Sequence, residues 1–331
     1  MKVCLYDHHQ FIIPTDGIGG VIGTFQILYD GLRKNGVDLT LIVNENSTLL
    51  SEKNFKVIKL PFSEIQNLRF GLVPIVKYFQ GDIFYSNSSG RNVNFDFSGF
   101  KGKWVSTCHG CEENVGGADC QIFVSNNQLI QHFRDNLFDN FGNDYRVIYN
   151  VVDTNDYFFE PGSHDKIVWM GRIDGAKSER LYDIASNLKH DIIVAGWYTD
   201  EFEWLFEKLI SLPNIKWVGK VEGVEEKRKF YSNAKLSIHC STFEDPCPTT
   251  VLEAQACGIP VATYSNGSMN EICFDKSLIF DKLENLKNYI ENQSDSIFPK
   301  LDERIQFIES KFNANEYSKK YYKIFKSLIN E

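Results

Sequence analysis

The chain has 331 residues, of which 43% are hydrophobic and 24% charged, and its formal net charge is −9. This length predicts two domains, and this composition is typical of soluble globular proteins. An acidic chain lacks the basic surface that neutralises nucleic-acid phosphates, so nucleic-acid binding is excluded as the expected function.

The sequence predicts a cytoplasmic protein. The N-terminal residues MKVCLYD enter a strand directly, and the chain contains no apolar run long enough to be a signal peptide core or to cross a membrane. The eight cysteines are scattered, which favours free thiols in a reducing compartment. Peripheral contact with the inner face of a membrane stays an alternative, although the negative charge weakens it.

Strands and helices alternate along the first half of the chain. The helix expected at 20–35 carries Val21, Phe25, Leu28 and Leu32 on one face at helical spacing. Alternation of this kind predicts a parallel sheet that is covered by helices on both faces. Strands are expected at 2–6, 37–43, 57–60, 82–85, 104–107, 120–124 and 146–148, and further helices at 64–79, interrupted near Pro74, and 127–138.

The same alternation restarts after a connection at 149–162, which has no clean period and ends in Pro-Gly. From 282 onward the chain is mostly helical, and a final helix at 315–328 has an aromatic face. The second half therefore predicts another parallel sheet. Its strands are expected at 166–170, 191–195, 215–218, 235–240, 259–263 and 278–280, and its helices at 178–188, 200–212, 222–233 and 249–257.

The stretch 239–262 reads as the end of a strand, a polar loop, a helix with Pro248 at its first position, and a short strand. Asp245 stands in the loop, and Glu253 lies about 8 Å along the helix from Pro248. The helix N-terminus between them suits a phosphate. This order of groups matches a nucleoside diphosphate sugar, with Glu253 on the ribose diol and Asp245 on the sugar hydroxyls. The alternative is a surface Glu and an Asp in a turn.

The string EDPCPTTVLEAQACGIPVAT resembles the signature of the retaining GT-B glycosyltransferases of the family 4 type, the glycosyl transferases group 1. In that family an acid and a Glu, spaced as Asp245 and Glu253 are, precede an Ala-rich turn and a Gly-x-Pro-Val strand. The first acid here is Asp where Glu is commoner, and Glu244 stands one position earlier. Which of Glu244 and Asp245 touches the sugar stays open.

Two cations follow the strand KIVWM in the predicted second domain. Arg172 and Lys177 could straddle a diphosphate and stabilise the charge on a leaving nucleotide without a metal. The family has a Gly-Arg pair and a Lys at the spacing seen from Gly171 to Lys177, although it usually has Gly where this chain has Ser178. The alternative is a pair of solvated charges in a loop.

Two further motifs lie in the predicted first domain. Gly19 and Gly20 resemble the family's Gly-Gly element, which approaches the donor phosphate, although a structural turn is as good an interpretation. His109 follows the strand WVSTC, where family members place a residue that contacts the donor sugar. The pattern Cys108-His109-Gly110-Cys111 also allows a metal site, but too few further ligands lie nearby in sequence.

The resemblance also indicates where the nucleotide base and the phosphates bind. Gly196 and the strand end at 217–220 would flank the base, and the turn at 267–272 resembles the family's Gly-Gly-x-x-Glu-Ile turn. The expected catalytic residues are His109, Asp245, Glu253, Arg172 and Lys177. The expected nucleotide-binding residues are Gly19, Gly20, Gly171, Arg172, Lys177, Gly196, Val218, Glu244, Pro248, Thr249, Thr250 and Glu253.

Together these features imply an α/β GT-B fold of two Rossmann-like doubly wound domains that face a cleft. The resemblance places the acceptor domain at 1–155 with the final helix 314–331, and the donor domain at 156–313. It implies a metal-independent retaining transferase with no tightly bound cofactor, a UDP- or GDP-sugar donor, and a carbohydrate or lipid-linked acceptor. The alternatives are a sugar-nucleotide epimerase, a glycosyl phosphorylase, or a non-catalytic sugar-nucleotide binder.

Overall fold

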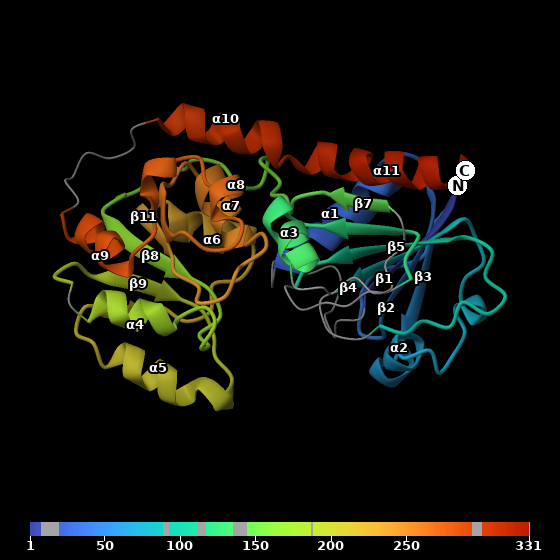
Figure 1. Ribbon diagram of the computed structural model, residues 1–331, viewed down its shortest axis with the longest axis horizontal. Coiled ribbons are helices and arrows are strands. Elements are labelled where there is room, and N and C mark those ends of the chain that lie inside the picture. Colours follow the sequence, from blue (N-terminus) through green and yellow to red (C-terminus); the bar gives the residue numbers. More distant parts are fainter. Residues whose placement is uncertain are drawn as a thin grey trace. The chain divides into compact units, whose positions relative to one another are not determined.

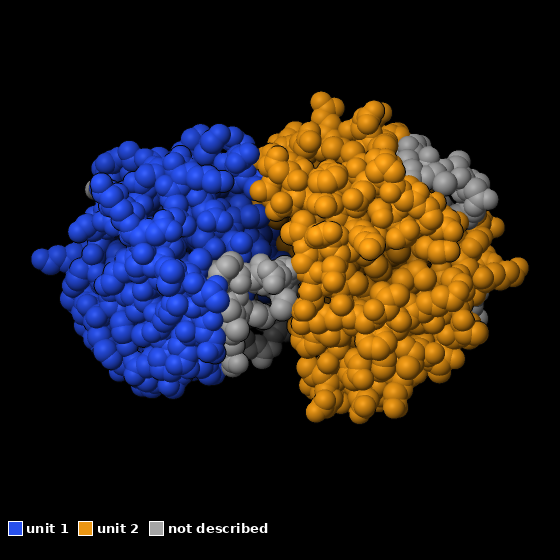
Figure 2. All heavy atoms as spheres, turned by 180° about the vertical axis from the view of Figure 1, so that it is seen from behind, with its two compact units in different colours: residues 1–150, 314–331 blue, residues 151–313 orange. Residues whose placement is uncertain are grey.

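The computed structural model describes residues 1–7, 20–88, 93–110, 117–134, 144–186, 188–292 and 300–330. The chain divides into two compact units (Figure 2). Unit 1 comprises Met1–Asn150 and Ala314–Glu331, and unit 2 comprises Val151–Asn313. Each unit is built on a parallel sheet with helices on both faces (Figure 1). The α/β fold class predicted from the sequence is therefore confirmed.

The described part of unit 1 contains a seven-stranded parallel sheet in the order β3-β2-β1-β4-β5-β6-β7. The strand order runs in opposite directions on either side of β1 and β4, which makes this a doubly wound sheet with a switch point between those strands. The strands are β1 (Lys2–Asp7), β2 (Asp38–Asn44), β3 (Phe55–Leu60), β4 (Ile83–Ser88), β5 (Lys103–Cys108), β6 (Cys120–Phe123) and β7 (Asp144–Val147). The helices are α1 (Gly20–Lys34), α2 (Phe62–Arg69), the short 3-10 helix η1 (Ile75–Lys77), α3 (Asn126–Arg134) and α11 (Ala314–Asn330).

The last helix, α11, belongs to unit 1 although unit 2 precedes it in the chain. It packs along α1, and its aromatic face enters the core of unit 1. The ring of Tyr321 meets that of Tyr85 edge-on, with the centroids 5.6 Å apart, and its hydroxyl lies 2.9 Å from Thr107 Oγ1. These buried contacts hold α11 on unit 1 through both apolar area and hydrogen bonding.

The described part of unit 2 contains a six-stranded parallel sheet in the order β10-β9-β8-β11-β12-β13, with its switch point between β8 and β11. Its core packs Trp169 and other apolar side chains of the strands against α4, α5 and α9. The strands are β8 (Lys166–Met170), β9 (Ile192–Ala195), β10 (Ile215–Trp217), β11 (Ala234–His239), β12 (Val261–Tyr264) and β13 (Ile279–Phe280). The helices are α4 (Glu179–Ala185), η2 (Asp200–Phe202), α5 (Glu203–Ile210), α6 (Val224–Tyr231), α7 (Thr249–Ala256), α8 (Met269–Ile272), η3 (Lys276–Leu278), α9 (Leu283–Glu291) and α10 (Leu301–Lys311).

Two expected helices differ from those observed. The helix expected at 64–79, with its interruption near Pro74, is observed as α2 and the short η1, and Pro74 is extended, with φ −68° and ψ 142°. The first part ends earlier than expected, at Arg69, because Gly71, with φ +69°, turns the chain out of the helix. In α7, Pro248 is the N-cap residue with ψ 122°, so Thr249, and not the proline, is the first helical residue. The C-terminal part of the helix expected at 127–138 lies outside the described residues.

Within the described part of the chain, no helix is long and apolar enough to cross a membrane. All seven cysteines described there are buried thiols.

Gly31 of α1 lies directly against Ser318 of α11, which allows a test of this contact. A Cβ added at Gly31 would overlap the Oγ and Cβ of Ser318, whereas one added at Gly23, also on α1, meets no described atom within 4 Å. We expect Gly31→Ala to lower the free energy of unfolding by about 1–3 kcal/mol, since overpacking forces the helices apart.

Gly23→Ala is the matched control, and we expect it to raise the free energy of unfolding by up to about 1 kcal/mol through helix propensity. Urea denaturation monitored by circular dichroism measures both changes. Ser318→Gly should restore the stability of Gly31→Ala, and equal effects of the two alanines would show that the α1–α11 contact is not close-packed.

Candidate functional site

Polar side chains gather at the switch point of unit 2, where β8 and β11 end. The loop 171–178 follows β8, and the loop 240–248 follows β11 and leads into α7. Thr242 joins the two loops, because its backbone N–H donates to Ala176 O at 2.7 Å. In open α/β sheets the carboxyl ends of strands at a switch point form the binding region. The structure thus gathers Arg172, Lys177 and Asp245 in one region of unit 2, and Glu253 lies on α7, the helix that follows the second loop.

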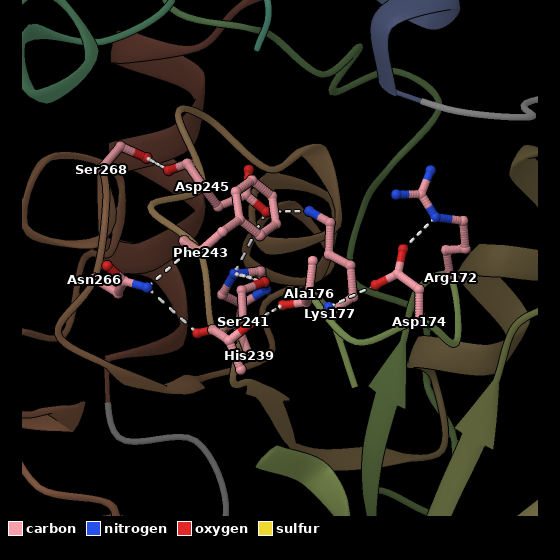
Figure 3. A network of polar contacts seen from close by, with 11 residues as sticks. Arg172, Asp174, Ala176, Lys177, His239, Ser241, Phe243, Asp245, Asn266 and Ser268 are labelled. Carbon is pink, nitrogen blue, oxygen red and sulfur yellow. Dashed lines mark hydrogen bonds and ion pairs between the residues drawn. The ribbon is translucent and has the colours of Figure 1, made fainter. Parts of the chain in front are cut away.

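Lys177 and Asp245 form an ion pair across these loops (Figure 3). Asp245 is only 5% exposed, and the Lys177 ammonium also lies 4.6 Å from the centroid of the Phe243 ring, within cation–π range. Asp245 is therefore not a turn residue in solvent, and Lys177 is not a solvated cation. The neighbouring Glu244 is half-buried.

Asp174 organises the loop that carries both predicted cations, and the sequence interpretation missed it. Its buried carboxylate accepts hydrogen bonds from Arg172 Nε and, at 2.7 Å, from the backbone N–H of Lys177 (Figure 3). Its carbonyl accepts from the backbone N–H of Ser178 at 3.0 Å. Asp often forms turns by accepting a hydrogen bond from a backbone N–H a few residues ahead. The position of Asp174 between Arg172 and Lys177 could therefore have predicted that it shapes this loop.

The backbone of Asp245 is held from the opposite side by the turn after β12. Ser268 donates to Asp245 O from its backbone N–H at 3.0 Å and from Oγ at 3.2 Å. Gly267 has φ +57°, and a Cβ there would overlap the backbone O and N of Asp245. Asn266 Nδ2 donates to Phe243 O at 2.7 Å (Figure 3). This turn therefore positions the loop that presents Asp245.

His239, the last residue of β11, lies beneath this ion pair. Its Nε2 is 3.7 Å from Asp245 Oδ2 and 3.3 Å from Ser241 Oγ. Burial lowers the pKa of His239 from its usual 6.5 to about 4; the Asp245 carboxylate opposes this shift and the Lys177 ammonium adds to it. The imidazole is thus neutral at neutral pH and presents no competing cation to Asp245.

Glu253 forms a second buried ion pair, with Lys227 of α6. Lys227 Nζ donates to Glu253 Oε1 at 2.9 Å, and both side chains are less than one-tenth exposed. The sequence interpretation missed Lys227. The helical period could have predicted that Lys227 is buried, because Lys227 and Tyr231 are one turn apart on α6 and both face the interior.

The N-terminus of α7 lies between Asp245 and Glu253 in the chain. Pro248 caps it and has no side-chain acceptor for the first N–H groups, and Thr249 and Thr250 are half-buried. The helix spans eight residues, which is enough for a partial positive charge at this end. The N-terminus of α7 thus stands between the two acids along the chain, and its use as an anion site stays a prediction.

The predicted base-binding residues lie at the neighbouring strand ends. Gly171 N donates to Ala195 O at 3.1 Å, which ties the end of β8 to that of β9. Trp217 Nε1 donates to Gly196 O at 3.0 Å, and Val218, just past β10, is half exposed. The structure therefore places these predicted residues along one edge of the sheet of unit 2.

The remaining predicted residues belong to unit 1. His109 follows β5, is 8% exposed, and its Nε2 lies 2.7 Å from Asn87 Oδ1 at the end of β4. Gly20 is the first residue of α1, while Gly19 and Cys111 lie outside the described residues. Among the residues that are described, no group of three or more His, Cys, Asp or Glu side chains could hold a metal ion.

His239 generates a test of the site's electrostatics. Because its pKa is lower in the folded than in the unfolded chain, the unfolded chain binds more protons as the pH falls from about 6.5 toward 4, and stability falls with it. We expect wild type to lose about 2 kcal/mol more between pH 7 and 5 than His239→Gln does. Urea denaturation at both pH values measures the difference. Identical pH dependences would mean that His239 is not held neutral.

The chain is similar to proteins whose families and structures are known. Residues 161–294 match the family described as glycosyl transferases group 1. Sucrose-phosphate synthase from Thermosynechococcus elongatus aligns with a TM-score of 0.78 at 13% identity, covering 99% of each chain. AviGT4, a glycosyltransferase involved in avilamycin A biosynthesis, aligns at 0.70 and 17%, covering 100% of this chain and 98% of that one.

HepE from Anabaena, solved in complex with UDP, aligns with a TM-score of 0.72 at 16% identity, covering 99% of this chain and 100% of its own. No curated protein matches the chain. These structural likenesses confirm the predicted GT-B fold. The family match includes both loops and α7, the elements that carry Asp174, Asp245 and Glu253. The chain therefore has the GT-B fold, and its residues 161–294 match the glycosyl transferases group 1 family.

Proposed function

We propose that the chain is a retaining glycosyltransferase that moves a sugar from a nucleoside diphosphate sugar to an acceptor hydroxyl. The observation that carries this proposal is the pair of buried carboxylates, Asp245 and Glu253, placed on either side of the α7 N-terminus and each paired with a lysine. Buried charges are costly, so we expect these two carboxylates to serve a ligand. The carboxylates can accept hydrogen bonds from its hydroxyls, and the helix N-terminus can bind its phosphate.

We assign the diphosphate to Arg172, Lys177 and the N-terminus of α7. The Arg172 side chain is 52% exposed, and its Nε is held by Asp174, so its remaining N–H groups can meet a phosphate. Lys177 has three N–H donors and can bind a phosphate oxygen while it still contacts Asp245. These positive groups would stabilise the leaving diphosphate without a metal ion.

The donor nucleotide that we favour is UDP. HepE, which shares the fold, has been solved with UDP and with UDP-glucose. Gly196 and Val218 at the ends of β9 and β10 would flank the base, and backbone groups there would read it. GDP stays the alternative base, since side chains at this edge do not discriminate the two.

In the proposed reaction the bond between the anomeric carbon and the diphosphate oxygen breaks, and the acceptor hydroxyl attacks from the same face. The leaving phosphate takes the proton of that hydroxyl, so no side chain is needed as a base. The acceptor hydroxyl is itself the nucleophile, so no covalent bond to the protein forms. Asp245 would hold the hydroxyls of the donor sugar, Glu253 the ribose diol, and His109 a further hydroxyl of the sugar. Oriented contacts of this kind lower the barrier by positioning and by electrostatic stabilisation.

We assign donor binding to residues 156–313, and acceptor binding to 1–155 with 314–331. The acceptor would be a carbohydrate hydroxyl, free or on a lipid-linked glycan. The lipid-linked form is supported by Phe70 and Leu72, which are 46% and 72% exposed just after Arg69 of α2. An exposed apolar pair beside a cation suits the edge of a lipid headgroup layer.

The adjacent acids Glu244 and Asp245 provide a matched test of the sugar contact. We expect Asp245→Asn to lower kcat by roughly two orders of magnitude, as for loss of one preorganised polar contact to a transition state. Glu244→Gln should stay within a few-fold of wild type. Transfer from a radiolabelled UDP- or GDP-sugar measures both. The reverse pattern would move the sugar contact to Glu244, and unchanged rates in both would reject this donor site.

Lys177 tests the diphosphate assignment. We expect Lys177→Ala to weaken the binding of UDP or GDP by about tenfold to a hundredfold, the effect of one lost charge-assisted hydrogen bond. The control is Lys216→Ala, which removes an exposed lysine paired with Asp191. Calorimetry on wild type and both variants measures the affinities. Equal losses would remove Lys177 from the site, and binding without transfer to any acceptor would favour an epimerase or a non-catalytic binder.

A further inference from the structure

Lys227 is a buried cation whose position the proposed reaction does not by itself require. It lies on α6, is 7% exposed, and donates to Glu253 Oε1 at 2.9 Å. The second carboxylate oxygen, Glu253 Oε2, is buried and has no hydrogen bond of regular geometry to a described residue, but the Tyr157 hydroxyl contributes a hydrogen bond to the carboxylate. Lys227 and Tyr157 therefore both hold Glu253, and its carboxylate keeps lone pairs that can accept a further hydrogen bond.

Two buried tyrosines, Tyr157 and Tyr231, lie near the Glu253 carboxylate of this pair. The pKa values of Tyr157 and Tyr231 are raised, first by burial and then by the negative charge of Glu253. Tyr231 already donates its hydroxyl to Thr250 O at 3.2 Å. Replacing a buried ion pair with apolar side chains is often neutral or stabilising, so stability alone does not account for its presence. A buried carboxylate that keeps spare lone pairs would also gain free energy from a hydrogen bond to a ligand hydroxyl.

A vicinal diol fits this arrangement chemically. Each hydroxyl of a diol can both donate and accept a hydrogen bond, whereas a carboxylate only accepts and an ammonium only donates. Glu253 Oε2 can accept from one hydroxyl, and Lys227 Nζ, which gives one of its three N–H groups to Oε1, can donate to the other. The pair therefore offers complementary groups to two adjacent hydroxyls.

We propose that Lys227 is a positioning residue of the donor site, which holds Glu253 for the ribose diol and makes the site select ribonucleotides over deoxyribonucleotides. This inference rests on the proposed function, because it takes Glu253 as the residue that meets the ribose. It adds to the site a residue of α6, which lies outside both loops and α7. It also adds a preference for ribose over deoxyribose, which a Glu253 side chain that is free to rotate would not supply. A site built around a hydroxyl rejects the analogue that lacks it, since buried groups are left unpaired.

The test compares the affinities of UDP and 2′-deoxy-UDP, and of GDP and 2′-deoxy-GDP, by calorimetry. Wild type should prefer the ribonucleotide by about tenfold or more, the value of one charge-assisted hydrogen bond. In Lys227→Met this preference should fall to within about twofold, although Glu253 is intact. The matched control is Lys229→Met, which removes an exposed lysine from the same helix and should keep the wild-type preference.

Lys227→Met leaves Glu253 without its cation, so its fold is checked by circular dichroism. If it does not fold, Lys227→Arg keeps the charge balance but moves the donor atoms, and should lower the preference at least threefold. A folded variant with the wild-type preference would overturn the role of Lys227 while leaving the proposed function in place. A wild type that binds neither UDP nor GDP would instead reject the proposed function itself.

Discussion

The site of unit 2 depends on two buried carboxylates that cannot be left without a partner. Asp245 pairs with Lys177, and Glu253 pairs with Lys227, in each case a lysine from a different element. An unpaired buried carboxylate would cost several kcal/mol, so each acid constrains the segment that carries its lysine. The loop after β8 and the helix α6 are therefore tied electrostatically to the loop and helix that follow β11.

The topology of the sheet explains why these charges meet. Strand order reverses between β8 and β11, so the chain leaves the sheet in opposite directions at their carboxyl ends. The loop after β8 brings Arg172 and Lys177, and the loop after β11 brings Asp245 and the N-terminus of α7. Local bonds then set the details, as Asp174 and the turn at Gly267 brace one loop each.

Periodicity and turn chemistry predicted most of unit 2, because these are local properties of the chain. The strand expected at 166–170 is β8, and the glycine after α7 ends that helix as expected. What local patterns could not predict is the choice of partners. The sequence interpretation gave Lys177 to a phosphate and overlooked Lys227, yet both lysines pair with acids that lie far along the chain. Partner choice is decided by tertiary packing, which spacing alone does not encode.

Internal pairing also changes what binding of a donor would require. When a ligand binds, the acids of such a site are already paired with lysines, so they are not left without a compensating charge. The acids and lysines then exchange some of their contacts with each other for contacts with the ligand. Lys177 can turn part of its hydrogen bonding toward a phosphate while Asp245 gains a hydroxyl, and Lys227 can stay on Glu253 throughout. The affinity would then depend on how much better the acids and lysines are paired in the complex than in the free protein. This favours ligands that offer both an anion and suitably spaced hydroxyls. The lysines that would meet the proposed donor are thus the same groups that keep Asp245 and Glu253 paired within the fold.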